Sequence, residues 1–353
     1  MAEELGVREA VLAMRGYTPG EQPRVGKAIK LNTNENPFPP SSKAIAAIQA
    51  AATGALQRYL DPVGTAFRME AARKWGLEPD WILCGNGSDD LLTILTRTFV
   101  GEGDLLRFPT PSYVLYRTLA QIQGARVDEV PFRADWTLGD DFTSHDDRLR
   151  LVFLPNPNSP SGTLLSPEQV ARLAEQLPCP LVVDEAYADF ATTCCIDLVR
   201  DHANVIVTRT LSKSYGLAGL RFGYLVARPD LVAQMIKVKD SYNCDALSIA
   251  GATAAVADES WLRGNVEQVL ALRASLAEGL EQLGFDVVPS QANFVWCTHP
   301  RGGHESLYLG LKSQGILVRY MVYDGWGDGL RISVGTQDQQ AALLRVLAEM
   351  LAS

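Results

Sequence analysis

Short apolar segments alternate with amphipathic ones through the middle of the chain, from about residue 82 to residue 227. The segments at 149–154, 181–183 and 204–207 are rich in leucine, valine and isoleucine and have the length of buried strands. Between such segments apolar residues return every three or four positions, as at 91–99, which is typical of one face of a helix. This alternation predicts an α/β fold with a mostly parallel sheet flanked by helices.

The pattern changes after residue 241, where long helical stretches precede short apolar strands. Helices are expected at 247–256 and 259–284, strands at 292–296, 316–319 and 330–334, and a last helix after Thr336. These elements predict a second, smaller α+β domain. We therefore expect three parts, which are an N-terminal arm at 1–40 that joins the small domain, a large domain at 41–245, and a small C-terminal domain at 246–353.

Composition narrows the class of protein. The 353 residues carry a net charge of −9 without any basic block, which argues against nucleic acid as a partner. No apolar run reaches transmembrane length and the N-terminus lacks a signal-peptide pattern, so we expect a cytoplasmic protein with no membrane partner. The six cysteines form no C-x-x-C pair, and the chain has neither an H-E-x-x-H motif nor a Cys/His cluster. Reduced thiols and no metal site are predicted.

The candidate chemistry centres on Lys213, which follows a predicted buried strand. Thr210, Ser212 and Ser214 surround it with hydroxyl groups, and Arg221 lies a short way along the chain. A lysine in such a place suits an imine with an aldehyde cofactor, and hydroxyls with an arginine suit a phosphate group. Both properties describe pyridoxal 5'-phosphate. A solvated lysine in a surface loop is the alternative, but four further segments suit the same cofactor.

Two of these segments offer an anion site and a stacking surface. The segment at 85–90 joins a short strand to a helix through two glycines, which presents backbone N–H groups and the helix dipole to an anion. It is neither a dinucleotide fingerprint nor a P-loop, and a simple N-capped helix is the alternative. Tyr113 or Tyr116 could stack on a flat heteroaromatic ring, although Tyr116 is the better candidate for a core aromatic.

The other candidate ligand-binding residues are charged side chains on or at the ends of predicted strands. Asp184 ends the strand at 181–183, where a carboxylate is costly unless a cation such as a protonated pyridine nitrogen lies against it. Tyr187 could reach a phenolic oxygen on the same ring. A salt bridge is the alternative for Asp184, but the carboxyl ends of strands in open α/β sheets bind ligands. Arg319 and Arg331 stand on otherwise apolar strands, which indicates anionic partners.

Together these residues resemble the fold-type-I pyridoxal-phosphate aminotransferases, and among them the histidinol-phosphate aminotransferases, over almost the whole chain. The motifs that carry the resemblance are N-E-N-P-F-P (34–39), Y-x-D-P (59–62), G-N-G-S-D (85–89), P-x-P-S-Y (109–113), N-P-N-S-P-S-G (156–162), D-E-A-Y (184–187), R-T-L-S-K (209–213), G-L-R-x-G (219–223) and L-R-I-S-V-G (330–335). The resemblance implies an aspartate-aminotransferase-like fold, a homodimer, and transamination of L-histidinol phosphate with 2-oxoglutarate in histidine biosynthesis. An aromatic amino-acid aminotransferase, a threonine-phosphate decarboxylase and a non-catalytic pyridoxal-phosphate-binding regulator are the alternatives.

The resemblance also implies roles for single residues. Lys213 would bind the cofactor covalently and then transfer a proton, Asp184 would keep the pyridine nitrogen protonated, and Tyr187 would bond the phenolic oxygen. The other residues that it assigns to the cofactor are Gly87, Ser88, Asp89, Tyr113, Asn158, Ser159, Thr210, Ser212, Arg221, and Tyr59, which in this family reaches the cofactor of the partner subunit. The residues that it assigns to the substrate are Tyr17, Asn36, Arg319 and Arg331.

One position departs from the family pattern. The family commonly has N-N-P-T-G, in which the second asparagine bonds the phenolic oxygen, and Ser159 holds that position here. Because serine is shorter, the departure implies a bridging water, a substitute role for Asn158, or Tyr187 acting alone. It leaves the roles implied for Lys213 and Asp184 unchanged.

Overall fold

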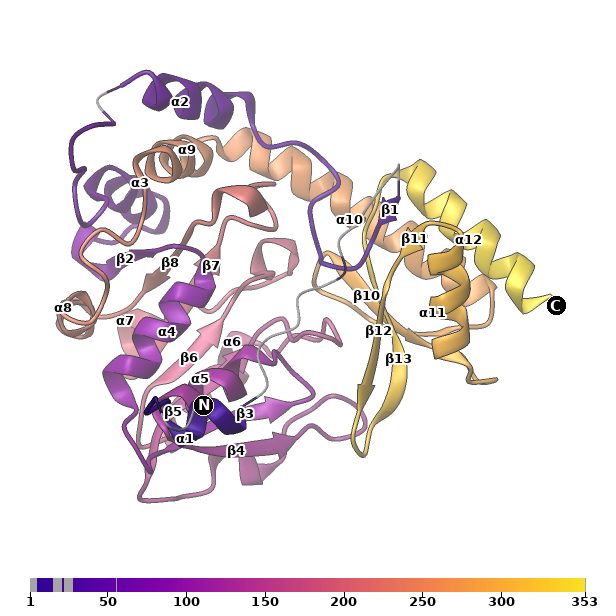
Figure 1. Ribbon diagram of the computed structural model, residues 1–353, viewed down its shortest axis with the longest axis horizontal. Coiled ribbons are helices and arrows are strands. Elements are labelled where there is room, and N and C mark those ends of the chain that lie inside the picture. The colour runs from indigo at the N-terminus through magenta and orange to yellow at the C-terminus, as the bar shows by residue number, and fades with distance from the viewer. Residues whose placement is uncertain (1–4, 15–20, 22–27, 55, 353) are drawn as a thin grey trace.

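A seven-stranded sheet forms the centre of the larger part of the molecule (Figure 1). The computed structural model describes residues 5–14, 21, 28–54 and 56–352. In the order in which they lie side by side, the strands are β2 (Ile82–Gly85), β8 (Gly223–Val226), β7 (Val205–Thr210), β6 (Leu181–Asp184), β5 (Leu149–Pro155), β3 (Leu105–Thr110) and β4 (Arg126–Pro131). Strand β8 runs in the opposite direction to the other six strands, which all run the same way. The predicted mostly parallel sheet is therefore confirmed.

Helices cover both faces of this sheet, which explains why its strands are apolar on both sides. On β5, Val152 and Leu154 face one core while Leu151 and Phe153 face the other, as the two-residue period of a strand requires. One face is covered by α4 (Ser88–Phe99), α5 (Leu115–Gln123) and α8 (Pro229–Ile236). The other is covered by α3 (Thr65–Trp75), α6 (Pro167–Gln176), α7 (Leu198–Asp201) and α9 (Ala246–Ala257).

The smaller part is built on an antiparallel sheet with the order β12 (Arg319–Tyr323), β13 (Gly327–Ser333), β10 (Phe294–Thr298) and β9 (Asp286–Val288). The helices α11 (His304–Ser313) and α12 (Gln337–Leu351) belong to this part (Figure 1), and so does the C-terminal half of α10 (Glu259–Gln282). The N-terminal arm joins it, because β1 (Ile29–Lys30) pairs in parallel with β11 (Ile316–Leu317) and Leu31 enters its core. Ser333 of β13 then bonds to the arm residues Leu31 and Asn34. Asn34 in turn contacts Tyr187 of the larger part, so the arm lies at the junction between the two parts.

Side chains cap the N-termini of several helices. Ser41 caps α2 (Ser42–Ala52) by accepting a hydrogen bond from the backbone N–H of Ala44. Ser166 and Thr336 form complete capping boxes at α6 and α12. The remaining short helical elements are α1 (Glu9–Ala13), η1 (Pro79–Trp81), η2 (Asp140–Thr143), η3 (Ala188–Phe190) and η4 (Ala218–Leu220). No described helix combines the length and the apolar character that crossing a membrane requires.

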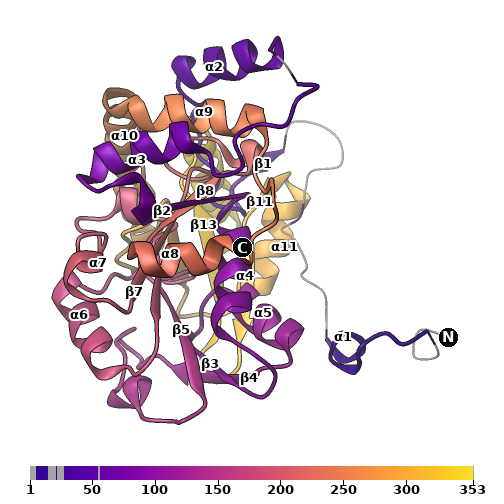
Figure 2. The same cartoon turned by 90° about the vertical axis from the view of Figure 1, so that its left-hand side faces the viewer.

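Helix α9 packs with the large part, although the sequence division assigns residue 246 onward to the small domain. It lies against α2 and α3, and Figure 2 shows the three helices together at one end of the molecule. Its Ala252 and Val256 are buried in the same core as the large sheet. The change from one core to the other occurs along α10, where Leu262 belongs to the first core and Leu276 to the second.

Candidate active site

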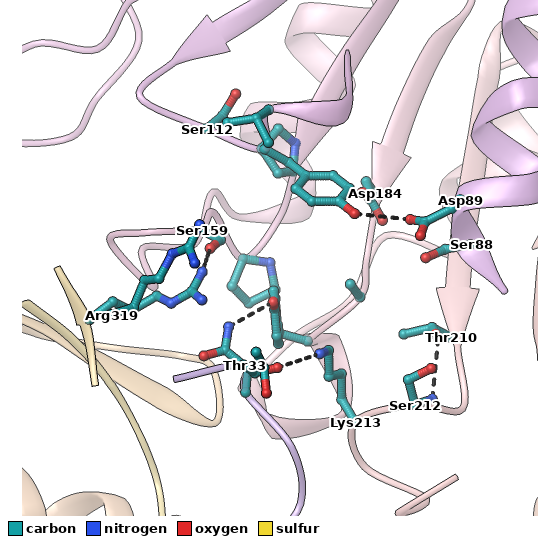
Figure 3. A pocket seen from close by; sticks show the side chains of 18 of the residues that line it. Thr33, Ser88, Asp89, Ser112, Ser159, Asp184, Thr210, Ser212, Lys213 and Arg319 are labelled. Carbon is teal, nitrogen blue, oxygen red and sulfur yellow. Dashed lines mark hydrogen bonds between the residues drawn. The ribbon is translucent and has the colours of Figure 1, made fainter. Parts of the chain in front are cut away.

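A cavity of about 270 Å³ lies between the carboxyl ends of β5, β6 and β7 and the strands of the small sheet. Residues of the arm, of the large sheet and of the small sheet all contribute to its walls (Figure 3). The cavity brings together the predicted site residues Ser88, Asp89, Tyr113, Ser159, Asp184, Tyr187, Thr210, Ser212, Lys213, Arg221, Arg319 and Arg331. Among the described residues, no group of three or more His, Cys, Asp or Glu is arranged to hold a metal ion.

Two other predicted residues that the structure describes, Asn36 and Tyr59, do not line this cavity. The Asn36 amide donates to the backbone carbonyl oxygens of Lys213 (2.9 Å) and Ser214 (3.3 Å), so it fixes the lysine's backbone and does not line the cavity. Tyr59 is 84% exposed and stacks on Tyr242, with 4.6 Å between ring centroids. Tyr17, predicted to bind substrate, lies outside the described residues.

Lys213 follows β7 and is half-buried in the cavity wall. Its ammonium nitrogen donates to the carbonyl oxygen of Thr33 in the arm over 3.1 Å and lies 5.8 Å from the centroid of the Tyr187 ring. The Ser212 N–H donates to the Thr210 hydroxyl over 3.2 Å, which forms the tight turn that presents the lysine. A single carbonyl bond leaves the amine able to turn toward a ligand in the cavity.

Asp184 lies buried at the end of β6, and among the described residues the groups that hydrogen-bond to its carboxylate are neutral. Its two oxygens accept hydrogen bonds from the hydroxyls of Tyr116 (2.7 Å) and Thr208 (3.0 Å). Burial raises the pKa of Asp184 above its usual range, against the lowering effect of these two hydrogen bonds. A cation bound in the cavity beside Asp184 would offset that desolvation, so the site favours a positively charged ring or group.

Tyr116 and Thr208 therefore belong to the site. The sequence favoured Tyr116 as a core aromatic, which its full burial agrees with, and it gave no role to Thr208. Burial, together with the nearby Asp184, raises the pKa of Tyr116 well above its usual range, so its phenol stays a proton donor to the carboxylate. Thr208 stands directly opposite Asp184 in the pairing of β6 with β7. This contact could be predicted only once the pairing of β6 with β7 was known, because the sequence shows each strand only as an apolar run.

An anion cradle lies where β2 turns into α4. Gly87 precedes the helix with φ +84°, and a side chain there would put its Cβ 2.7 Å from Nη2 of Arg221. The free N–H groups of the first turn of α4, the hydroxyls of Ser88 and Ser212, and the Arg221 guanidinium surround the same corner of the cavity. Asp89 pairs with Arg221 at 3.6 Å and accepts from the Tyr113 phenol at 3.1 Å, which suits a role in orienting both.

The small sheet presents two arginines to the cavity. Arg319 on β12 and Arg331 on β13 are directly paired in the antiparallel register, so their side chains project side by side from one face. Nη1 of Arg331 donates to the Ser159 hydroxyl over 2.9 Å, and Nη2 donates to the carbonyl oxygen of Asn32 over 3.1 Å. Figure 3 shows Arg319 beside this contact, at the opposite wall from Asp184.

The family model described as "Aminotransferase class I and II" matches residues 26–347. The chain belongs to this family. The aminotransferase is 57% identical to the histidinol-phosphate aminotransferase of Rhodopirellula baltica over 347 residues, which is 98% of this chain and 96% of that protein. The match confirms the predicted family and accounts for an end-to-end resemblance.

Solved structures agree with the fold of this aminotransferase. The histidinol-phosphate aminotransferase of Sinorhizobium meliloti, solved in complex with pyridoxal-5'-phosphate, superposes with a TM-score of 0.83 at 27% identity and covers 92% of this chain and 91% of that chain. An aspartate aminotransferase variant of Thermus thermophilus gives a TM-score of 0.82 at 21% identity, with 98% and 99% covered, and bears on the fold alone. The predicted aspartate-aminotransferase-like fold is confirmed.

The position that departs from the family pattern has a defined surrounding in this aminotransferase. Ser159 accepts the hydrogen bond from Arg331. The buried Asn158 amide donates to the carbonyl oxygen of Pro111 (3.2 Å) and to the Ser161 hydroxyl (2.9 Å), and it does not line the cavity. A substitute role for Asn158 toward the phenolic oxygen therefore has no support in this geometry.

Proposed function

We propose that this protein is a pyridoxal-phosphate-dependent aminotransferase that transfers the amino group of L-histidinol phosphate to 2-oxoglutarate, a step of histidine biosynthesis. The name of the relative that is 57% identical over nearly its whole length supports this substrate. The observation that carries the proposal is the pairing of Arg319 with Arg331 in the wall opposite Asp184.

Two adjacent arginines indicate a ligand with more than one negative charge. Like charges placed directly opposite each other on neighbouring strands destabilise a sheet, so the pair favours an anion between or above them. A phosphate near neutral pH carries more than one charge and several acceptor oxygens, and guanidinium groups match this geometry. Histidinol phosphate has no α-carboxylate, so its phosphate is the group that such a pair would hold.

The residues around the cavity fit pyridoxal phosphate. The cradle of Ser88, Ser212 and Arg221 with the first turn of α4 suits the cofactor's phosphate, and the buried Asp184 suits its protonated pyridine nitrogen. When bound, the cofactor supplies an electron sink for the charge that develops at the substrate's Cα. Lys213 would hold the cofactor and then take the Cα proton on Nζ, and the Tyr113 ring would cover the cofactor's face.

Arg319→Ala tests the substrate. We expect kcat/KM for histidinol phosphate to fall by a factor that corresponds to a loss of about 2–4 kcal/mol of transition-state binding, because one or two charge-assisted hydrogen bonds are lost. The values for phenylalanine and tyrosine should fall less, whereas Arg331→Ala should impair both substrate types because glutamate also needs an arginine. Steady-state kinetics with each amino donor measures the difference.

Arg345→Ala is the matched control, because this exposed arginine on α12 pairs with Glu349 away from the cavity and its loss should leave all rates unchanged. Unchanged turnover of histidinol phosphate by Arg319→Ala would contradict the phosphate-clamp proposal and favour an aromatic amino-acid aminotransferase. Release of CO2 from a phosphorylated amino acid would favour the decarboxylase.

We also propose that the active unit is a homodimer with its sites at the interface. Tyr59 is exposed beside Tyr242 and does not line the cavity of its own chain, which agrees with a role in the partner's site. A ring pair that is open to solvent in the single chain is also a suitable contact surface for a second copy.

Mixed dimers test the role of Tyr59. Lys213→Ala and Tyr59→Ala homodimers should each be inactive or strongly impaired, but after subunit exchange the mixed dimer should contain one intact site and recover activity. Mixing Lys213→Ala with Asp184→Asn is the control and should recover none, because both changes affect the same chain's site. Absence of recovery with Tyr59→Ala, when mass spectrometry confirms exchange, would contradict the assignment across the dimer.

A further inference from the structure

Asn34 in the arm makes a direct bond to the site that neither the sequence motifs nor the family pattern assigns. Its amide nitrogen donates to the Tyr187 phenol oxygen over 2.9 Å. Asn34 is 1% exposed and adopts a left-handed backbone conformation with φ 54°. Asparagine tolerates this region better than most residues, so the position combines a demanding backbone with a specific side-chain contact.

The remaining polar atoms of Asn34 are all held by the small part of the molecule. Its backbone N–H donates to the Ser333 hydroxyl over 2.8 Å, and its side-chain oxygen accepts from the same hydroxyl over 3.1 Å. The Asn293 amide donates to its carbonyl oxygen over 3.0 Å. These bonds fix the backbone and the side-chain oxygen of Asn34, and so hold its amide nitrogen beside the Tyr187 phenol.

This arrangement decides which way the phenol of Tyr187 can donate. Because the oxygen accepts a hydrogen bond from Asn34, the phenol proton is left for an acceptor in the cavity. Ser159 is engaged elsewhere, because its hydroxyl accepts a hydrogen bond from Nη1 of Arg331 over 2.9 Å. We propose that Asn34 is a positioning residue that aims the Tyr187 phenol at the cofactor's phenolic oxygen, while Ser159 holds the substrate-binding arginine. The inference rests on the proposed function, because it requires pyridoxal phosphate in the cavity.

The two arm residues before Asn34 also hydrogen-bond to the site, one to the small sheet and one to the large part. The carbonyl oxygen of Asn32 accepts from Arg331, and that of Thr33 accepts from Lys213. Arg331 and Ser333 are two positions apart on β13, so one strand holds the arm beside both the arginine and Asn34. The arm therefore connects Arg331, Lys213 and the Tyr187 phenol through hydrogen bonds.

The test is the pH midpoint of the bound cofactor's visible absorbance, which is independent of turnover. A hydrogen bond donated to the phenolic oxygen favours the deprotonated, more electron-rich form of the chromophore and lowers its midpoint. Tyr187→Phe should therefore raise the midpoint. Asn34→Gly, which suits a positive φ, should raise it by about half a pKa unit to one unit. In the double variant Asn34→Gly should add almost nothing to the effect of Tyr187→Phe.

A second variant keeps the proposal open to refutation if Asn34→Gly does not fold. Asn34→Asp preserves the shape, but its carboxylate accepts the Tyr187 proton and turns it away from the cavity, so the midpoint should again rise. Asn204→Ala is the control, because it removes a structural amide that bonds Ala174 away from the cavity and should leave the midpoint unchanged.

The outcomes separate this inference from the function on which it rests. A folded, cofactor-loaded Asn34→Gly or Asn34→Asp protein with the wild-type midpoint would overturn the positioning role and leave the proposed function intact. If Asn34→Gly shifted the midpoint by its full amount in the Tyr187→Phe variant as well, the positioning role would also be overturned, because the two residues would then act independently. Wild-type protein that acquires no cofactor absorbance with pyridoxal phosphate would instead refute the proposed function.

Discussion

Lys213→Ala is expected to abolish turnover while the protein stays folded. The lysine follows a buried strand, and its amine is held by one carbonyl bond to Thr33, so its removal costs little packing or hydrogen bonding. Without it, no other described amine lies in the cavity wall to take the substrate's Cα proton. Steady-state kinetics should show no turnover above background, and the thermal unfolding midpoint should stay near that of the wild type.

Borohydride fixation of the cofactor, followed by peptide mapping, checks the site of attachment directly. The modified peptide should contain Lys213 in the wild type, and modification should be lost in Lys213→Ala. Lys237→Ala, which changes an exposed lysine just after α8, should keep both the adduct and the activity. An adduct on another lysine, or substantial turnover by Lys213→Ala, would contradict the proposed role.

Sequence reasoning identified the strands and side chains whose signal is local. The apolar runs of β5, β6 and β7 predict buried strands because both of their faces are covered by helices. Asp184 and Lys213 stood out because charged groups at the ends of such strands need a reason to be there. Edge strand β4 (Arg126–Pro131) was missed because it is partly exposed and carries no apolar run.

The contacts that sequence reasoning could not supply are those between distant segments. Asn34 and Tyr187 are far apart along the chain, and their bond exists only because β13 holds the arm over the large sheet. The side-by-side position of Arg319 and Arg331 likewise depends on the register of the β12–β13 hairpin, which the sequence showed only as two separate strands. Such contacts follow from sheet pairing, and pairing has no signature within a single segment.

Asp184→Asn is expected to separate stability from catalysis, because the carboxylate is costly without a cation beside it. Burial raises the pKa of Asp184 in the folded protein, so the folded chain binds more protons than the unfolded chain above about pH 4. The contribution of Asp184 to stability is thus present at low pH and lost as the pH rises through its folded-state pKa. Asparagine has no charge to desolvate, and the Tyr116 and Thr208 hydroxyls can reorient to bond its oxygen and its amide.

The cofactor-free variant should therefore unfold at a temperature no lower than that of the wild type near neutral pH, and its stability should depend less on pH. Catalysis should change in the opposite direction, since an amide cannot stabilise a protonated pyridine as a carboxylate does. We expect single-turnover proton removal to slow by more than about tenfold, which corresponds to about 1.4 kcal/mol, with pyridoxal phosphate still bound. Asp146→Asn, which neutralises a carboxylate paired with Arg148 at the surface, is the matched control and should leave the rate unchanged. A smaller effect of Asp184→Asn on the rate would exclude the electron-sink role, because the buried carboxylate would then serve only the packing of β6 against β7.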